Sequence, residues 1–183
     1  ERRQWPADIS FMDAAVLAGE KALISSGISR EKIGLIIDTS VCRERLEPSS
    51  AVTVHHKLGM PSTCINFDLS NACLGFVNGM HMAGAMIESK QIDYALIVDG
   101  EGTREISENT IQGLLKKEAT FDDLFLNFAS LTLGSGSAAM VIGRQSENPG
   151  SHSILGGFFH AASEHHDLCV GSLQSMRTDT SAL

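Results

Sequence analysis

The sequence predicts an α/β protein whose sheet is largely parallel. Short apolar runs rich in β-branched residues alternate along the chain with longer runs whose apolar residues recur at helical spacing. This alternation is typical of strands that are joined by crossover helices. The chain is 43% hydrophobic and 20% charged, which is ordinary for a globular domain with a buried core.

The first helix is predicted over residues 11–26, where small and apolar side chains fall on one helical stripe. Ser10 and Asp13 resemble a capping box, with Asp in place of the usual Glu or Gln. Gly27 follows and is expected to end the helix.

A strand buried on both faces is predicted next, over residues 33–40. Residues 48–58 are predicted to form a helix, with Pro48 near its first turn, where proline is favoured. The predicted strand CINFDL, residues 64–69, leads into a helix that follows Cys73, and the strand YALIVDG is predicted at residues 94–100.

Two more strands are expected towards the end of the chain, SAAMVIG at 137–143 and SILGGFFH at 153–160. A polar turn separates them, so we expect an antiparallel edge of the sheet there. Before them lies a long excursion with an amphipathic stretch at 108–118 and the stretch FDDLFLNFASL at 121–131. Connections of this length are usually lids, pocket walls or interfaces.

The bulk properties exclude several classes of function. A formal net charge of −8 disfavours general nucleic-acid binding, which needs Lys and Arg to replace counterions. No run of about 18 apolar residues predicts a membrane span, and the first residues lack the apolar run of a signal peptide. The four cysteines form no C-x-x-C pair and are too sparse for a disulfide framework, so free thiols in a reducing cytoplasm are expected.

Cys73 is the candidate nucleophile. It lies where the strand 64–69 is followed by a helix, and the amides at a helix start carry about half a positive charge, which favours the thiolate. In open α/β sheets ligands bind beyond the carboxyl ends of the strands. Placement alone leaves a simple core cysteine as an equal alternative, and the other cysteines are interpreted as core residues: Cys42, Cys64 and Cys169.

The helix after Cys73 carries a stripe of small residues, Gly75, Gly79 and Ala83. Each glycine costs a helix about 1 kcal/mol relative to alanine. We therefore expect another helix backbone to approach this stripe closely. The helix is therefore expected to be central and covered on several sides, and no helix within the chain is an obvious mate.

These residues resemble a known family. The stretch FDLSNACLGF at 67–76, with the small-residue helix and YALIVDG, resembles the thiolase superfamily, in particular its ketoacyl-ACP synthase III branch. Three further stretches agree: ISREKIGLIIDTS at 28–40, LEPSSAVTVHHKLGM at 46–60 and LGSGSAAMVIG at 133–143. The resemblance implies a thiolase-like layered fold of which this chain is one half. It also implies that Cys73, at the start of a buried central helix, takes the acyl group.

The chain departs from that branch at two places. GSGS at 134–137 replaces the usual Gly-Asp-Gly, and Glu47 replaces an apolar residue that reaches into the partner subunit's acyl pocket. A carboxylate before Pro48 resembles the olefin-biosynthesis condensing enzymes, which join two fatty acyl-CoA molecules head to head into a 2-alkyl-3-ketoacyl product. That resemblance implies that Glu47 is the base of the condensation. An ordinary helix-start carboxylate is the competing interpretation.

The resemblance also carries expectations about the whole protein. Residues 1–150 correspond to an N-terminal thiolase-like half, and residues 151–183 to the start of the connection to a C-terminal half that supplies the catalytic His and Asn. A homodimer, fatty acyl-CoA or acyl-ACP substrates and the absence of a cofactor or metal are implied. The histidines of the last part of the chain are not assigned the catalytic role: His160, His165 and His166.

Several aromatic and apolar residues are candidates for an acyl tunnel, although they are equally typical of a simple core: Phe76, Met80, Phe125 and Phe128. The pairs His55–His56 and His165–His166 lack a third ligand at convincing spacing for a metal. Three functions remain open. They are non-decarboxylating condensation of acyl-CoA, decarboxylating synthesis of the synthase III type with malonyl-ACP, and a non-catalytic subunit that keeps the fold.

Overall fold

The computed structural model describes residues 3–116, 118–147, 150–168 and 170. The chain divides into two compact units. The first comprises Glu1–Gly102 with Gly134–Gly150, and the second comprises Thr103–Leu133 with Ser151–Leu183. The excursion between Gly100 and Gly136 is thus largely part of the second unit.

The first unit is built on a four-stranded sheet with the order β2-β1-β3-β4. β1 (Ile33–Asp38) pairs in parallel with both β2 (Ile65–Asp68) and β3 (Tyr94–Glu101). β4 (Gly136–Gly143) runs antiparallel to β3 along one edge. The predicted α/β fold with a largely parallel sheet is therefore confirmed.

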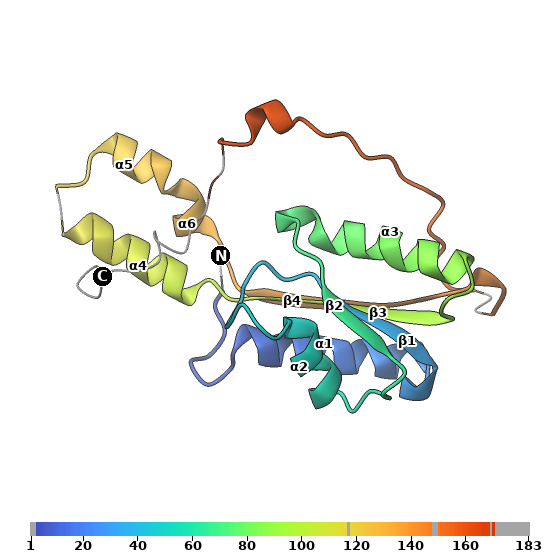
Figure 1. The fold of residues 1–183 in the computed structure, drawn as a ribbon. Coiled ribbons are helices and arrows are strands. Elements are labelled where there is room, and N and C mark those ends of the chain that lie inside the picture. Colours follow the sequence, from blue (N-terminus) through green and yellow to red (C-terminus); the bar gives the residue numbers. More distant parts are fainter. Residues whose placement is uncertain (1–2, 117, 148–149, 169, 171–183) are drawn as a thin grey trace. The chain divides into compact units, whose positions relative to one another are not determined.

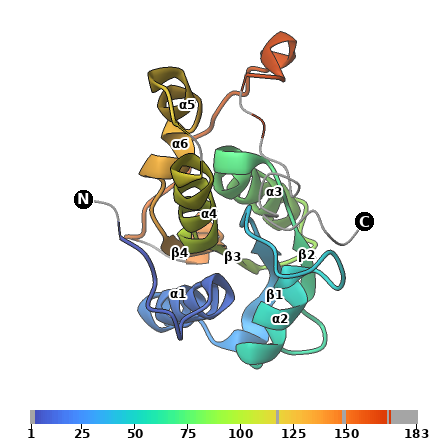
Figure 2. The same ribbon diagram turned by 90° about the vertical axis from the view of Figure 1, so that its left-hand side faces the viewer.

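Helices cover both faces of this sheet (Figures 1 and 2). α1 (Phe11–Ser26) and α2 (Ser50–Lys57) lie on one face, and α3 (Gly75–Glu88) lies on the other. The side chains of β1 and β3 alternate between two apolar clusters, as the twofold period of a strand requires. The cluster under α1 and α2 contains Ile36, Leu96 and Val98, and the cluster under α3 contains Leu35, Ile37, Ala95 and Ile97.

α1 has the ends that the sequence predicts. The Asp13 backbone N–H donates to Ser10 Oγ over 3.0 Å, and the Ser10 backbone N–H donates to Asp13 Oδ2 over 3.3 Å, which completes the capping box. Gly27 has φ 68° in the left-handed conformation, and its N–H reaches the carbonyls of Ile24 and Leu23. Only glycine adopts this conformation without a steric penalty.

Two predicted boundaries differ by a few residues. The strand predicted to reach residue 40 ends at Asp38, and α2 begins at Ser50 rather than at Pro48. The first amides of α2 donate to Asp68, which lies on β2. A helix start that is capped from a distant strand leaves no local sequence signal.

The prediction of a strand at residues 153–160 is wrong. Residues 152–162 have no regular secondary structure, and the residues of this stretch are exposed. A strand needs a neighbouring strand to bind its N–H and C=O groups, and the described part of the chain offers none there. The antiparallel edge exists, but it is formed by β4 and β3.

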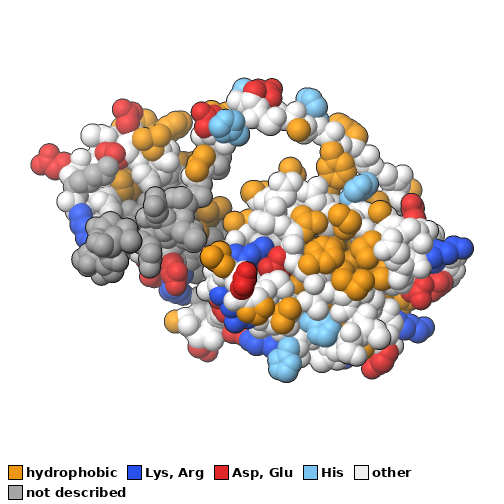
Figure 3. Space-filling view, viewed as in Figure 1, with side chains coloured by type: hydrophobic (Ala, Val, Ile, Leu, Met, Phe, Trp, Pro, Cys, Tyr) orange, Lys and Arg blue, Asp and Glu red, His pale blue; other side chains and the backbone are white. Residues whose placement is uncertain are grey.

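The stripe of small residues on α3 faces the chain's own sheet. Gly75, Gly79 and Ala83 are buried. A Cβ atom added at Gly79 would lie 3.1 Å from Thr39 Cγ2 and 3.3 Å from Ile97 Cγ2. The expectation that a helix from elsewhere packs on this stripe is therefore wrong, because the close approach is to β1 and β3. The opposite face of α3 is exposed, and hydrophobic side chains gather over this helix in Figure 3.

The second unit is helical. α4 (Arg104–Leu115), α5 (Phe121–Leu126) and α6 (Phe128–Thr132) form in the predicted amphipathic and apolar stretches. Ser107 Oγ donates to the Ser130 carbonyl over 3.2 Å and ties α4 to α6. In the described ranges, no helix has the length and hydrophobicity that a membrane crossing requires.

Candidate active site

Cys73 lies on a tight turn between β2 and α3. The turn is a single 3₁₀ turn, Ala72–Leu74, and α3 begins directly after it at Gly75. The Cys73 side chain is exposed. The structure therefore places the predicted nucleophile just beyond the carboxyl end of β2 and at the start of a helix, where an incoming carbonyl group could reach it.

The backbone of this turn is closely constrained. Ala72 has φ 44°, a left-handed conformation that costs a non-glycine residue about 1–3 kcal/mol and that is typical of functional sites. A Cβ atom added at Gly75 would lie 2.8 Å from the Thr39 carbonyl oxygen, so only glycine fits there. Asn71 Nδ2 donates to Asn78 Oδ1 over 2.5 Å and ties the turn to α3. These contacts fix the turn that carries Cys73.

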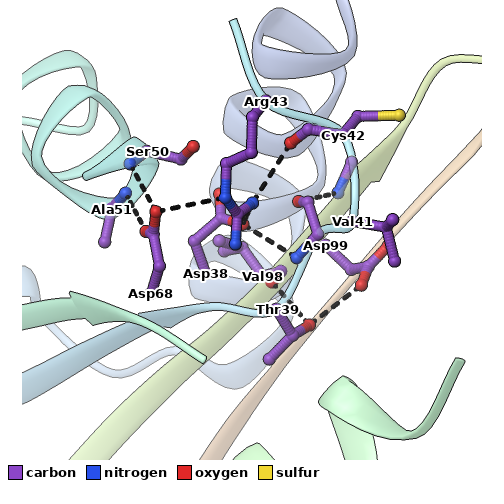
Figure 4. Close-up of polar contacts among 12 residues, drawn as sticks. Asp38, Thr39, Val41, Cys42, Arg43, Ser50, Ala51, Asp68, Val98 and Asp99 are labelled. Atoms are coloured by element: carbon purple, nitrogen blue, oxygen red, sulfur yellow. Dashed lines mark hydrogen bonds and ion pairs between the residues drawn. The ribbon is translucent and has the colours of Figure 1, made fainter. Parts of the chain in front are cut away.

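Carboxylates line the carboxyl ends of the three parallel strands (Figure 4). Asp38 at the end of β1 is directly opposite Asp68 at the end of β2. Asp99 lies near the end of β3, and its Oδ2 accepts a hydrogen bond from Thr39 Oγ1 over 2.9 Å. An Asp at the end of each parallel strand, in IIDTS, NFDLS and VDGE, was a signal that sequence reasoning missed.

Arg43 lies among these carboxylates. Its Nε is 3.5 Å from Asp68 Oδ2, and its Nη1 is 3.8 Å from Asp38 Oδ1. Asp68 also accepts hydrogen bonds from the backbone N–H groups of Ser50 and Ala51, both over 2.8 Å. One carboxylate thus joins Arg43 to the start of α2, and neither Arg43 nor Asp68 was among the predicted site residues.

Burial dominates the acid–base properties of Asp38. The residue is 1% exposed, and its Oδ2 has no hydrogen-bond partner among the described residues. Burial raises the pKa of Asp38, while the hydrogen bond from the Ser40 N–H and the charge of Arg43 oppose that shift. Burial also raises the pKa of Asp99, and the hydrogen bond from Thr39 opposes that shift.

Glu47 lies on the exposed segment 41–49, which connects β1 to α2. The peptide bond between Glu47 and Pro48 is cis. Within the described residues, the Glu47 carboxylate makes no hydrogen bond or ion pair. Glu47 and Cys73 follow the carboxyl ends of neighbouring parallel strands, so both belong to the same edge of the sheet.

The predicted tunnel residues fall in both units. Phe76 and Met80 are partly buried and pack against the apolar cluster under α3. Phe125 and Phe128 are exposed on α5 and α6 of the second unit. A role for any of these residues in acyl binding stays a prediction.

The remaining cysteines have the environments of structural residues. Cys64 is buried in the cluster under α1 and α2, and burial raises its pKa to about 11. Cys42 is partly buried, and its Sγ accepts a hydrogen bond from the Gly102 N–H over 3.3 Å. Burial, with a contribution from Glu101, raises the pKa of Cys42 to about 12. Cys169 lies outside the described residues.

Within the described ranges, no group of three or more His, Cys, Asp or Glu residues is placed to hold a metal ion. His55 Nε2 lies 3.1 Å from the Pro61 carbonyl oxygen, which accounts for one member of the His55–His56 pair. The expected absence of a metal or cofactor stays a prediction.

Comparisons of sequence identify known proteins that this chain resembles. Residues 67–161 match the model of the family 3-oxoacyl-[acyl-carrier-protein (ACP)] synthase III. An acyl-CoA:acyl-CoA alkyltransferase from Xanthomonas campestris is 45% identical over 182 residues, which cover 100% of this chain and 54% of that protein. A β-ketoacyl-[acyl-carrier-protein] synthase III from Sodalis glossinidius is 31% identical over 168 residues, covering 92% of this chain and 47% of that protein.

A solved structure shows the same likeness. Xanthomonas campestris OleA, in a cysteine-to-serine variant with bound lauric acid and lauroyl-CoA, has a TM-score of 0.90 and 44% identity. The match covers 94% of this chain and 51% of that chain. The expected thiolase-like half is thereby confirmed. The chain spans about half the length of the curated relatives it matches.

Proposed function

Because this chain belongs to the 3-oxoacyl-[acyl-carrier-protein] synthase III family, we propose that it carries the nucleophile of an enzyme that condenses two fatty acyl-CoA molecules without decarboxylation. The proposed product is a 2-alkyl-3-ketoacyl-CoA. Similarity along the whole of this chain to an acyl-CoA:acyl-CoA alkyltransferase supports this proposal. Because the chain covers only about half of that relative, the activity belongs to the complete protein.

In the first step the Cys73 thiolate attacks the thioester carbonyl of one acyl-CoA. A bond forms between Sγ and the acyl carbon, the bond to the CoA sulfur breaks, and CoA leaves as the thiolate, which takes a proton from solvent. The exposed side chain of Cys73 at the start of α3 supports this role. The backbone N–H of Cys73 is the proposed donor to the developing oxyanion.

In the second step Glu47 removes a proton from the α-carbon of the second acyl-CoA. The carbanion attacks the carbonyl of the acyl-enzyme, a carbon–carbon bond forms, and Cys73 leaves as the thiolate. Both carboxylate and thiolate return to their starting states once Glu47 releases its proton to solvent.

The observation that carries the choice of this reaction is the carboxylate at position 47. Solved OleA structures include variants of a cysteine and of a glutamate. The separation between those two positions in OleA equals the separation between Glu47 and Cys73 in this chain. Another solved OleA structure carries a substituted histidine. This histidine follows the OleA cysteine at such a distance in the sequence that equal spacing would place its counterpart in this protein beyond Leu183. This supports a C-terminal half that supplies the histidine.

The second candidate is decarboxylating synthesis with malonyl-ACP, which similarity to β-ketoacyl-ACP synthases III favours. Decarboxylation generates the carbanion directly and needs no base at Glu47. The complete protein is therefore incubated with myristoyl-CoA alone and, separately, with myristoyl-CoA and malonyl-ACP. A branched 3-ketoacyl product from myristoyl-CoA alone is expected. A product that forms only with malonyl-ACP would favour the second candidate.

Glu47→Gln tests the assignment of the base. The substitution keeps size and most hydrogen bonding but removes the basic carboxylate, and acylation of Cys73 needs no α-proton removal. The acyl-enzyme should form and hydrolyse as before, while condensation falls by about 10²–10⁴-fold, the usual size of general-base catalysis. Intact mass spectrometry follows the acyl-enzyme, and chromatography of the extracted lipids follows the product. Unchanged condensation would contradict the role of Glu47.

A further inference from the structure

We propose that Arg43 and Asp68 are positioning residues that hold the segment 41–49 so that Glu47 can act as the base of the condensation. This inference rests on the proposed function. It follows from the hydrogen bonds at the two ends of the segment, while the Glu47 carboxylate itself has no partner among the residues that the structure describes.

Both ends of the segment are held by carboxylates from other strands, and Figure 4 shows Asp68 at the second of these ends. At its start the Glu101 carboxylate accepts hydrogen bonds from the backbone N–H groups of Val41 over 2.6 Å and Cys42 over 3.1 Å. At its end Asp68 accepts from the N–H groups of Ser50 and Ala51. Charged acceptors make the stronger class of hydrogen bond, so both ends of the segment have defined positions.

Arg43 connects the two ends. Its Nε faces Asp68 Oδ2 at 3.5 Å, and its Nη1 donates to the Cys42 carbonyl over 3.1 Å. The Arg43 side chain is 23% exposed and that of Asp68 is 17% exposed. This pair is partly shielded from water, so its attraction is screened less than that of a surface ion pair.

The position of Glu47 depends on these contacts of the segment 41–49. Its own carboxylate makes no hydrogen bond or ion pair within the described residues, and its neighbour Leu46 is 87% exposed. The position of the carboxylate is therefore set by the course of the backbone between Arg43 and Ser50, within which Arg45 also donates a hydrogen bond to Thr53 of α2. A shift of about 1 Å at a reacting group can lower a rate by about 10²-fold.

Arg43→Gln in the complete protein tests the inference. With myristoyl-CoA, condensation should fall by about 10–10²-fold while formation of the acyl-enzyme changes by less than about 2-fold. The matched control is Arg30→Gln. Arg30 also pairs with a carboxylate, Glu20, and donates to a backbone carbonyl, that of Leu58, but it precedes β1 at the other end of the strand. This variant should leave both steps unchanged.

A double-substitution cycle separates positioning from a merely structural role. If Arg43 acts through Glu47, the Arg43→Gln/Glu47→Gln protein should condense acyl-CoA no more slowly than Glu47→Gln alone. Losses that multiply would overturn the inference, as would an equal fall in acyl-enzyme formation. Arg43→Lys keeps the charge and should restore part of the condensation rate.

Asp68→Asn gives an independent readout if Arg43→Gln does not fold. Asparagine keeps an oxygen that can cap α2 but lacks the charge that faces Arg43. The same selective loss of condensation is expected, and unchanged condensation would overturn the inference. A complete protein that acylates Cys73 but never condenses acyl-CoA would instead overturn the proposed function.

Discussion

At the scale of single residues, the three described cysteines differ in exposure. Cys73 is exposed, whereas burial raises the pKa of Cys64 to about 11 and that of Cys42 to about 12. Raised thiol pKa values keep these two groups protonated near neutral pH, and the thiol is a poor nucleophile. The environments of Cys42 and Cys64 are thus those of poor nucleophiles, which supports the proposed role of Cys73.

This difference predicts the site of acylation. Mixing the complete protein with an acyl-CoA should give one acyl adduct by intact mass spectrometry, and peptide mapping should place it on Cys73. Cys73→Ser should lose the adduct, whereas Cys42→Ser, the control, should retain it. An adduct that forms at the same rate on another cysteine of the Cys73→Ser protein would show that the assignment is wrong.

Asp38 gives a pH-dependent prediction. Burial raises the pKa of Asp38, so the folded protein holds this proton more tightly than the unfolded chain does. Its contribution to stability is present in full below the ordinary value of 3.8 and is lost as the pH rises through the folded-state value. Relative to the unsubstituted protein, Asp38→Asn should therefore gain stability as the pH rises above the ordinary pKa of 3.8.

Urea unfolding at a series of pH values checks this prediction, and Asp13→Asn is the control of opposite sign. The hydrogen bond from Lys57 and that from Ser10 lower the pKa of Asp13. Asp13 therefore stabilises the fold above its ordinary pKa, and its replacement should lose stability, relative to the unsubstituted protein, as the pH rises. The same trend in both variants would contradict the assigned effect of burial on Asp38.

At the scale of elements, the sequence predicted what local residues determine. α1 and both of its caps were predicted correctly, because Ser10, Asp13 and Gly27 act on their own neighbours. The prediction of a strand at 153–160 was wrong, because an apolar pattern does not supply the partner strand that a strand needs. Asp68 was missed as a cap and as a partner of Arg43, since both contacts join residues that are far apart in the sequence.

The small-residue stripe of α3 was recognised but assigned to the wrong neighbour. Spacing shows that a helix face is close to another backbone, but it does not show which backbone. The contact of Gly75 with the Thr39 carbonyl lies at the crossing of α3 over the end of β1, a feature of topology. The candidate nucleophile could be predicted because its turn is contiguous in sequence. The contacts that hold the segment 41–49 could not, because they join it to residues far away in the sequence.

Gly75 and Gly84 provide a matched test on the same helix. Gly75→Ala places a methyl group 2.8 Å from the Thr39 carbonyl oxygen, a backbone atom, so overpacking should cost about 1–3 kcal/mol. A Cβ atom added at Gly84 would meet no described atom within 4 Å outside the nearby backbone of α3, so Gly84→Ala should gain up to about 1 kcal/mol from helix propensity. In thermal unfolding, the melting temperature of Gly75→Ala should lie below that of the unsubstituted protein and that of Gly84→Ala above it. Gly75→Ala should also slow acylation of Cys73. The reverse ranking would contradict the packing of α3 on β1.

At the scale of the whole molecule, the outer side of α3 and the turn before it expose large apolar side chains. Leu74 on the turn and Val77 and Met82 on α3 are 58%, 51% and 44% exposed. Large exposed apolar patches mark surfaces that other chains or segments cover. The sheet already covers the small-residue stripe, so this outer face is what remains for the proposed C-terminal half.

The proposed dimer yields a test of which subunit each residue serves. In the family that this chain resembles, the residue before Pro48 reaches into the partner subunit's pocket, so Glu47 is expected to serve the Cys73 of the other chain. Glu47→Gln and Cys73→Ala proteins should each be nearly inactive in condensation. A mixed dimer should regain activity if Glu47 acts across the interface, because one of its sites then combines an intact Glu47 with an intact Cys73.

The statistics of subunit mixing give the expected recovery of activity. With random exchange of equal amounts of the two proteins, about half of the dimers are mixed, and each has one complete site. Product formation from myristoyl-CoA should therefore recover to about a quarter of the unsubstituted rate, since one site in four then has both groups. Subunit exchange is verified with differently tagged chains, and re-mixing each variant with itself is the control. If Glu47 serves its own chain, every site in the mixture lacks one group, and the mixture stays as inactive as its components despite proven exchange.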